Sequence, residues 1–287
     1  VKGVLRDELI AIRDKYGDAR KTEIQDIEDD IDIEDLIEEE ECVFTLSHGG
    51  NIKRVPVDEY TAQKRGGKGV RAATLRDEDY VETVFTASTH DYILFFTDRG
   101  RCYRKKGYLI PEAGRTARGV NIVNFIQVEK DEKVSAMLHV REMDDDSFLI
   151  FATRSGTVKR MALSALRNIR TSGIRALTLD EGDELINVMR TDGSQNILMA
   201  THNGQAICFA ETDVRPMGRE AVGVRGIRLK DGDWVVGAEI AQPDASVLSI
   251  TEHGYGKRTP ASEYIRGGEE PQHRGGSGMK NYNITDK

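Results

Sequence analysis

The chain has 287 residues, a formal net charge of -8 and a hydrophobic share of 38%, and it contains no apolar run long enough to cross a membrane. The acidity is local, because residues 1–41 carry 6 Lys and Arg against 16 Asp and Glu, whereas the rest is close to neutral. Cys42, Cys102 and Cys208 lie far apart and form no CxxC pair, which argues against zinc and disulfides and for a reducing, cytoplasmic compartment.

The first 41 residues predict a helix followed by an acidic linker. Leu5, Leu9 and Ile12 recur at helical spacing within residues 4–16, and Gly17 is suited to end the helix. Residues 18–41 are rich in Asp and Glu with isoleucines between them. They are either a solvated linker or a segment that docks on the next domain, where its carboxylates would compete with a polyanion for basic residues.

From residue 42 onward the sequence repeats. A turn-and-strand pattern of the type Thr-Asp-Arg-Gly recurs with its glycine at positions 50, 100, 156, 204 and 254. A glycine followed by an apolar residue starts a further strand at 69, 119, 173, 223 and 278. An acidic turn at 79, 131, 183 and 233 precedes another apolar strand. Three patterns in phase, about 50 residues apart, predict structural repeats.

Each repeat contains four short apolar strands, in the first repeat at about 42–46, 51–56, 70–75 and 81–87. We therefore expect an all-β, propeller-like array of four-stranded blades over 42–287. The repeats span about 42–91, 92–145, 146–194, 195–243 and 244–287, and the last is incomplete.

Cations recur at two positions of the repeats, and radially arrayed blades would bring them to one rim that tracks a phosphate backbone. Single Lys/Arg pairs commonly only solvate strand edges, so the recurrence carries this hypothesis. The candidate rim residues are Lys53, Arg54, Arg104, Lys105, Lys106, Arg115, Arg118, Lys159, Arg160, Arg170, Arg215, Arg219, Lys257, Arg258 and Arg274.

The densest cluster is a loop that combines glycines with cations: Gln63, Lys64, Arg65, Gly66, Gly67, Lys68 and Gly69. Glycines allow close approach of a backbone, and clustered Lys and Arg favour phosphate. The loop is not a nucleotide-binding P-loop, because Gly and not Ser or Thr follows Lys68. We find no nucleophile elbow and no metal-ligand spacing, so we predict no catalytic residue and no cofactor in this chain.

These residues carry a resemblance to a known family. The loop from Gln63 to Gly69 resembles the gyrase-A box, and the repeats resemble the C-terminal domain of bacterial DNA gyrase A. Residues 1–17, with the stretch from Arg13 to Arg20, resemble the end of the helix that leaves the N-terminal core of gyrase A. The resemblance implies a β-pinwheel whose blades exchange strands and whose rim wraps double-stranded DNA, with Lys64, Arg65 and Lys68 as the wrapping determinant.

The resemblance also implies partners outside this chain. The catalytic tyrosine would lie in the N-terminal core, and ATP hydrolysis with its Mg²⁺ would lie in gyrase B, within an A2B2 assembly that introduces negative supercoils. Three alternatives remain: the equivalent domain of topoisomerase IV, which steers substrate choice; a protein-interaction propeller; and a nucleotide-binding enzyme. The intact box argues against the first, and a single Trp without repeated blade signatures argues against the second.

Overall fold

A computed structural model describes residues 2–18, 22, 33–60, 79–265 and 271–284. The chain divides into two units, Val1–Ile37 and Glu38–Lys287. In the first unit the expected helix is α1 (Lys2–Tyr16), followed by the short 3-10 helix η1 (Ile33–Leu36). The amide of Gly17 closes the helix on the carbonyl of Arg13 at 2.7 Å. None of the described helices has the length and hydropathy needed to span a membrane.

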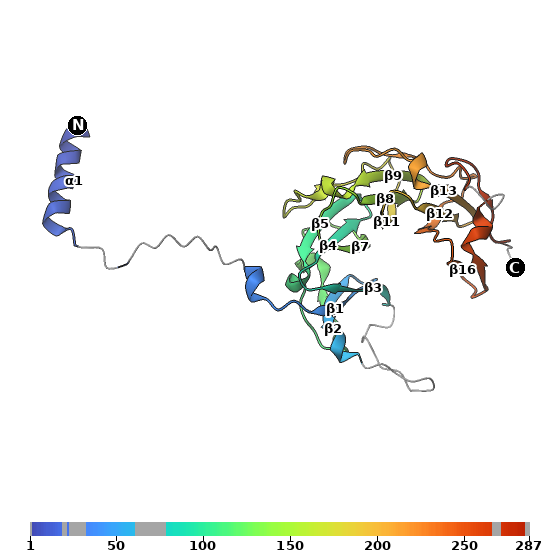
Figure 1. Cartoon of the computed structure of the whole chain (residues 1–287), viewed down its shortest axis with the longest axis horizontal. Helices are drawn as coiled ribbons and strands as arrows, with labels where there is room; N and C mark the ends of the chain where they lie inside the picture. Colours follow the sequence, from blue (N-terminus) through green and yellow to red (C-terminus); the bar gives the residue numbers. More distant parts are fainter. Residues whose placement is uncertain (1, 19–21, 23–32, 61–78, 266–270, 285–287) are drawn as a thin grey trace. The chain divides into compact units, whose positions relative to one another are not determined.

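The second unit is built from small antiparallel sheets that follow one another in chain order, from β1 and β2 through β8 and β9 to β16 (Figure 1). The strands of its first half are β1 (Glu41–Ser47), β2 (Asn51–Pro56), β3 (Val81–Ser88), β4 (Tyr92–Thr97), β5 (Arg101–Lys106), β6 (Val120–Asn121), β7 (Val134–Val140), β8 (Phe148–Thr153) and β9 (Thr157–Ala162). The strands of its second half are β10 (Ile174–Arg175), β11 (Leu185–Thr191), β12 (Asn196–Thr201), β13 (Gln205–Ala210), β14 (Val224–Arg225), β15 (Val235–Ile240), β16 (Ser246–Ile250), β17 (Gly256–Pro260) and β18 (Met279–Lys280).

Four sheets have four strands each, in the orders β3-β1-β2-β6, β10-β5-β4-β7, β11-β8-β9-β14 and β15-β12-β13-β18, and β16 and β17 form a hairpin. This confirms the predicted all-β, propeller-like fold with four-stranded blades. The short 3-10 helices η2 (Val57–Glu59), η3 (Gly107–Leu109), η5 (Leu163–Leu166), η6 (Glu211–Asp213) and η7 (Ala261–Tyr264) follow the second strand of each hairpin, and η4 (Ile122–Asn124) follows β6.

Neighbouring sheets exchange strands. The two-residue strands β6, β10, β14 and β18 each leave their own repeat and pair with the second hairpin strand of the preceding sheet. A sheet and a sequence repeat therefore contain different residues. The first-repeat strand expected at 70–75 lies outside the described residues.

The hydrophobic core lies between successive sheets. Leu94 and Phe96 of β4 share one cluster with Leu149 and Phe151 of β8, and the rings of Phe96 and Phe151 meet edge to face at 5.6 Å. A second cluster joins β1 to β4, and a third joins β8 to β12. Strands buried on both faces explain why these segments are apolar without alternation, as the sequence predicts.

Glycine is required where the exchanged strands dock. Gly119 and Gly223 precede β6 and β14, with φ of 86° and 114°. A Cβ on Gly119 would lie 2.5 Å from the carbonyl oxygen of Ile52, and one on Gly223 would lie 2.6 Å from that of Val158. No side chain fits at such distances. Glycine at these two positions therefore allows the main chain of one repeat to approach the backbone of the preceding sheet.

The acidic turns fasten the hairpins. The carboxylate of Asp79 accepts hydrogen bonds from the Gly49 amide and the Ser47 hydroxyl at 2.8 and 2.9 Å. Asp183 accepts from the Ser155 amide at 2.8 Å. These bonds join the start of the outer strand, β3 or β11, to the hairpin turn of the same sheet. The hydrogen bonds that Asp79 accepts hold its pKa below the usual value.

Candidate nucleic-acid interface

The glycine- and cation-rich loop from Gln63 to Gly69 lies outside the described residues, so its role stays a prediction. By repeat phase, Gly69 corresponds to Gly119 and Gly223, which precede exchanged strands. The other candidate cations lie within the described residues.

The Lys/Arg pairs on β2 and β9 are not on a rim, contrary to the sequence prediction. Lys53 and Lys159 are 2% and 0% exposed, and Arg160 is also buried. The guanidinium of Arg54 forms ion pairs with Glu40 and Glu112, both at 3.0 Å. These four side chains are used inside the fold, so we remove them from the proposed phosphate contacts.

The buried lysines hold the loops that lead to the exchanged strands. The ammonium of Lys53 donates to the carbonyl oxygen of Arg115 at 2.5 Å. That of Lys159 donates to the carbonyls of Ala176 and Arg219, both at 2.7 Å, and of Ala221 at 3.1 Å. Burial lowers the pKa of both lysines, to about 8 for Lys159.

The side chains of Arg104, Lys105 and Lys106 on β5 are half-buried and contact aromatic rings. Arg104 lies over the ring of Tyr92 at 4.7 Å and donates to the carbonyl of Arg167 at 2.8 Å. Lys106 lies over the same ring at 4.0 Å, and Lys105 lies over that of Phe125. The aromatic contacts hold these three cations close to the sheet, which leaves them less reach than a free surface side chain.

The loops that lead to the exchanged strands, here called exchange loops, carry exposed arginines. The side chains of Arg118, Arg170, Arg215 and Arg219 are exposed, and no hydrogen bond or ion pair joins them to other described side chains. Each lies in the loop that precedes an exchanged strand. Exchange loops of successive repeats therefore present a guanidinium with no partner among the described side chains, and this group is well suited to bind a phosphate oxygen.

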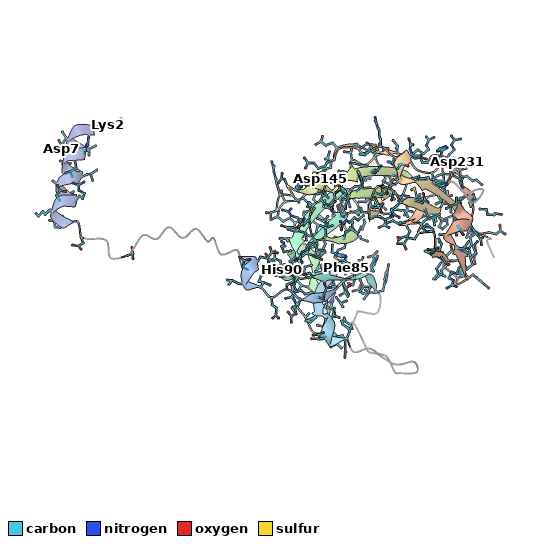
Figure 2. The ribbon with its side chains drawn as sticks, in the orientation of Figure 1. Lys2, Asp7, Phe85, His90, Asp145 and Asp231 are labelled. Atoms are coloured by element: carbon cyan, nitrogen blue, oxygen red, sulfur yellow. The ribbon has the colours of Figure 1, made fainter. Side chains whose placement is uncertain are left out.

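The other predicted rim residues differ in exposure and in the hydrogen bonds that their side chains make. Arg115 is half-buried and donates to the carbonyl of Glu59 at 3.0 Å, and Arg274 donates to the carbonyls of Asp213 and Arg225. Lys257 and Arg258 are exposed on β17. Asp145, labelled in Figure 2, pairs with Arg167 at 2.8 Å.

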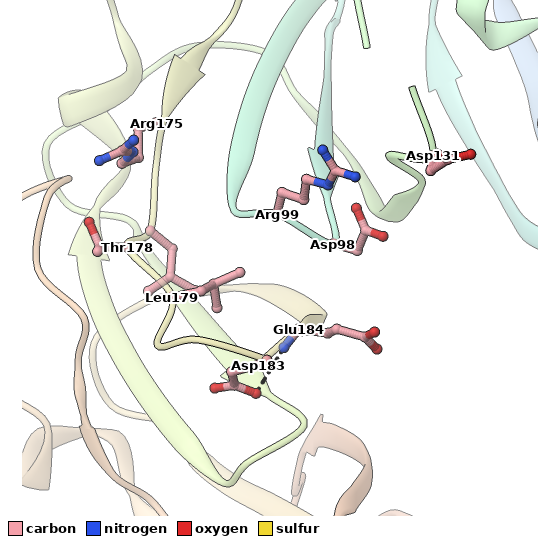
Figure 3. Close-up of a pocket in the computed structure, with 10 residues that line it drawn as sticks. Asp98, Arg99, Asp131, Arg175, Thr178, Leu179, Asp183 and Glu184 are labelled. Carbon is pink, nitrogen blue, oxygen red and sulfur yellow. Dashed lines mark hydrogen bonds between the residues drawn. The ribbon is translucent and has the colours of Figure 1, made fainter. Parts of the chain in front are cut away.

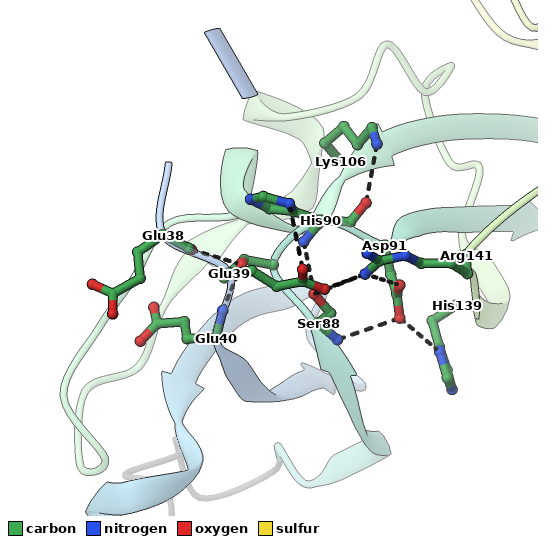
Figure 4. A network of polar contacts seen from close by, with 10 residues as sticks. Glu38, Glu39, Glu40, Ser88, His90, Asp91, Lys106, His139 and Arg141 are labelled. Atoms are coloured by element: carbon green, nitrogen blue, oxygen red, sulfur yellow. Dashed lines mark hydrogen bonds and ion pairs between the residues drawn. The ribbon is translucent and has the colours of Figure 1, made fainter. Parts of the chain in front are cut away.

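The end of the acidic segment packs against the first two sheets (Figure 4). The Glu39 carboxylate pairs with Arg141 and accepts from the Ser88 hydroxyl at 2.9 Å. Hydrogen bonds from Arg141 and Ser88 lower the pKa of Glu39 to about 2. The backbone of Glu40 exchanges hydrogen bonds with Thr89. Residues 38–40 thus dock on the blades, and two of their carboxylates occupy arginines.

A cleft between the turns of the second and third sheets is mainly acidic (Figure 3). Asp98, Asp131, Asp183 and Glu184 line it together with Arg99 and Arg175. Such a charge balance does not favour a phosphate group. Within the described part of the chain, no cluster of three or more His, Cys, Asp or Glu side chains is arranged to hold a metal ion.

Sequence reasoning identified the exchange-loop arginines but missed the buried lysines and the Glu39–Arg141 pair. One signal for the lysines was present, since the residue that follows the hairpin glycine by three is Lys53, Tyr103, Lys159 and Ile207 in successive sheets. Because Tyr and Ile occupy this position in two of the sheets, the position is expected to face inward.

The chain is similar to known proteins over its full length. The family model described as "DNA gyrase C-terminal domain, beta-propeller" matches residues 43–88, 91–141, 147–192, 195–242 and 245–287. The gyrase A protein of Clostridium acetobutylicum is 49% identical over 287 residues, which are 100% of this chain and 34% of that protein. The gyrase A protein of Staphylococcus aureus strain NCTC 8325 is 47% identical over 292 residues, 99% of this chain and 32% of that protein. The chain thus spans about a third of the length of these relatives.

Solved structures agree with the fold. A crystal structure of the C-terminal domain of DNA topoisomerase IV matches with a TM-score of 0.70 and 26% identity, over 85% of this chain and 73% of that one. A structure of a DNA gyrase A C-terminal domain matches with a TM-score of 0.69 and 27% identity, over 86% of this chain and 79% of that one.

Proposed function

The chain belongs to the DNA gyrase C-terminal domain, beta-propeller family, and we propose that it is the part of a gyrase A protein that bends and wraps double-stranded DNA. The observation that supports this proposal is the recurrence, on the exchange loops, of exposed arginines that pair with no other described side chain. They supply contacts to phosphates without reading bases, which is what a surface that wraps any sequence requires.

Wrapping needs many contacts that act together. Bending 20–30 bp by 40–90° costs roughly 1–6 kcal/mol, so no single arginine offsets it. Arg118, Arg170, Arg215 and Arg219 occupy three successive repeats, which distributes the contacts along the DNA. The loop from Gln63 to Gly69 adds three cations in the first repeat, and we propose that it anchors one end of the wrapped segment.

We assign the chemistry to other parts of a larger assembly. The catalytic tyrosine would lie in the N-terminal core of the same gyrase A protein, and ATP and Mg²⁺ would bind to gyrase B in an A2B2 complex. The wrapped segment would be presented for strand passage and yield negative supercoils. We place this assembly in the bacterial cytoplasm, where its DNA substrate is found.

The equivalent domain of topoisomerase IV is the second candidate, because a structure of that domain matches this chain as well as a gyrase structure does. The relatives with 47–49% identity are gyrase A proteins, which favours gyrase. A protein-interaction propeller is a weaker candidate, because it gives no reason for the recurring unpaired arginines.

Trapped writhe tests the proposal directly. Nicked circular DNA is ligated in the presence of the chain, and its linking number is read on a gel. We expect a positive shift for the wild type and its loss when Lys64, Arg65 and Lys68 are replaced by Ala. A linking number that never shifts while salt-sensitive binding persists would contradict wrapping, and an absence of binding would contradict the whole proposal.

A matched control removes the same charge elsewhere. Lys2, Arg6 and Arg13 lie on α1 in the first unit, and their replacement by Ala also lowers the net charge by three. We expect this control to retain the shift. If both triple variants lose the shift equally, net charge and not the position of the loop explains the effect.

A further inference from the structure

The buried ammonium group of Lys159 has no carboxylate partner among the described residues, and its donors are taken up by backbone carbonyls. The carbonyls belong to Ala176, Arg219 and Ala221, at 2.7, 2.7 and 3.1 Å. Three acceptors match the three protons of an ammonium group. A charge buried without a counter-ion is unfavourable, and an apolar side chain of similar volume commonly stabilises a fold as well or better.

The fold itself does not require lysine at this place. The equivalent position is Tyr103 in the second sheet and Ile207 in the fourth, both buried. Tyr103 donates to the carbonyl of Gln127 at 2.7 Å, and Ile207 packs in an apolar cluster. The reason for a lysine at this position must therefore lie in the groups that surround Lys159, and not in the fold of a sheet.

Those surroundings are two consecutive exchange segments. Ala176 follows β10, which the third repeat sends to the second sheet, and Arg219 precedes β14, which the fourth repeat sends to the third sheet. The two segments also touch directly, since the hydroxyl of Thr178 donates to the carbonyl of Glu220 at 2.9 Å. Lys159 on β9 is bonded to both, so it fixes one segment relative to the other.

The same bond recurs in the first sheet. Lys53 Nζ donates to the carbonyl of Arg115, which precedes Gly119 by the same four residues that separate Arg219 from Gly223. In both sheets the buried lysine thus holds the main chain of an arginine on an exchange loop. Only the carbonyl is held, so the side chain of Arg219 remains exposed to solvent.

We propose that Lys159, and Lys53 by the same arrangement, are positioning residues for DNA binding: each fixes the backbone of the exchange loop whose arginines contact phosphate. This rests on the proposed DNA-wrapping function. Neither ammonium group reaches DNA, and each acts through a loop. A fixed loop loses less conformational entropy when it binds and holds its guanidinium groups at a constant spacing from those of the next repeat.

The test is a double-mutant cycle on the whole chain with Lys159→Met and Arg219→Ala. Met keeps the length of the side chain and removes the charge and the donors, and Arg219→Ala keeps the carbonyl that Lys159 binds. Affinity for a linear duplex is measured over a range of salt concentrations, and bending is measured by energy transfer between dyes at the two DNA ends.

We expect Lys159→Met to lower the slope of log K against log salt by about one, the value for one lost phosphate contact, and to reduce bending. In the Arg219→Ala background the same substitution should change the slope much less. Equal effects in both backgrounds would overturn the proposal, because a general electrostatic effect of the buried charge does not depend on Arg219.

A control separates positioning from stability. Ile150→Val removes one methylene from β8 in the same sheet, where Ile150 is fully buried and its strand pairs with β9 and β11 but not with β14. Both variants are compared well below their thermal midpoints, and we expect only Lys159→Met to change the slope and the bend. If Ile150→Val changes them too, or if Arg219→Ala changes them and Lys159→Met does not, the positioning role is wrong. If the wild type does not bind DNA, the proposed function fails first.

Discussion

Gly223→Ala tests whether strand exchange supports the fold. Two costs add at this position. The φ of 114° is one that L side chains rarely adopt, and such strain costs about 1–3 kcal/mol. The new Cβ would also lie 2.6 Å from the carbonyl oxygen of Val158, so backbone must move and the β14–β9 hydrogen bonds weaken, at about 0.5–1.5 kcal/mol each. With two such hydrogen bonds, we expect a total loss of about 2–6 kcal/mol in the free energy of unfolding.

Gly182→Ala is the matched control. Gly182 has a φ of 78°, and a Cβ there would meet nothing within 4 Å, so this variant bears the cost of backbone strain alone. We expect it to lose about 1–2 kcal/mol. The difference between the two variants measures the close approach of the exchange segment.

Urea denaturation followed by the fluorescence of Trp234 measures both losses. Trp234 is the single Trp. It lies just before β15 of the fourth sheet and stacks on His202, with ring centroids 3.8 Å apart. We expect the urea midpoint to fall much further for Gly223→Ala than for Gly182→Ala. Equal shifts would refute the reasoning, because the contact with Val158 would then contribute nothing.

Three further predictions concern charges. Burial lowers the pKa of Lys159 from 10.5 to about 8, so the unfolded chain binds more protons than the folded chain between these values. Urea unfolding should therefore show the wild type gaining about 3 kcal/mol in stability over Lys159→Met as pH rises through that range. Glu39→Gln should lower the thermal midpoint at neutral pH, and the difference should shrink as pH falls from 4.5 towards 2, where the wild-type carboxylate is protonated. In DNA titrations, Arg170→Ala should lower the salt slope by about one, whereas Arg190→Ala should leave it unchanged because Arg190 pairs with Asp144.

Much of the fold was predictable because it repeats. A single hairpin with glycine at position 50 is a weak signal, but the same turn at 100, 156, 204 and 254 defines five units. Apolar runs such as residues 93–96 then identify strands buried on both faces. Each local pattern is ambiguous alone, and the constant phase between them removes the ambiguity.

The burial of Lys53 and Lys159 was not predictable from spacing. Two cations in succession on a strand point to opposite faces of the sheet, so at least one side chain is expected to reach solvent. Here the segments that lead from the next repeat to β6 and β14 accept hydrogen bonds from Lys53 and Lys159, and both lysines are buried. Those strands have two residues each, too few for a periodic signal, and they pair across roughly 70 residues of chain.

Strand exchange connects the proposed DNA-binding loops to the fold in a specific way. The hydrophobic clusters between sheets already hold neighbours together, as the contact between Phe96 and Phe151 illustrates. The exchanged strands add few hydrogen bonds, so their contribution is mainly geometric. Each one passes the loop of one repeat over the preceding sheet, where a buried lysine or another side chain can hold it. A load applied by bent DNA to Arg219 would therefore act on the third sheet by two routes, through the pairing of β14 with β9 and through Lys159 of β9. On the proposed function, we expect the rigidity of the array against that load, more than the number of its charges, to decide whether it bends DNA or only binds it.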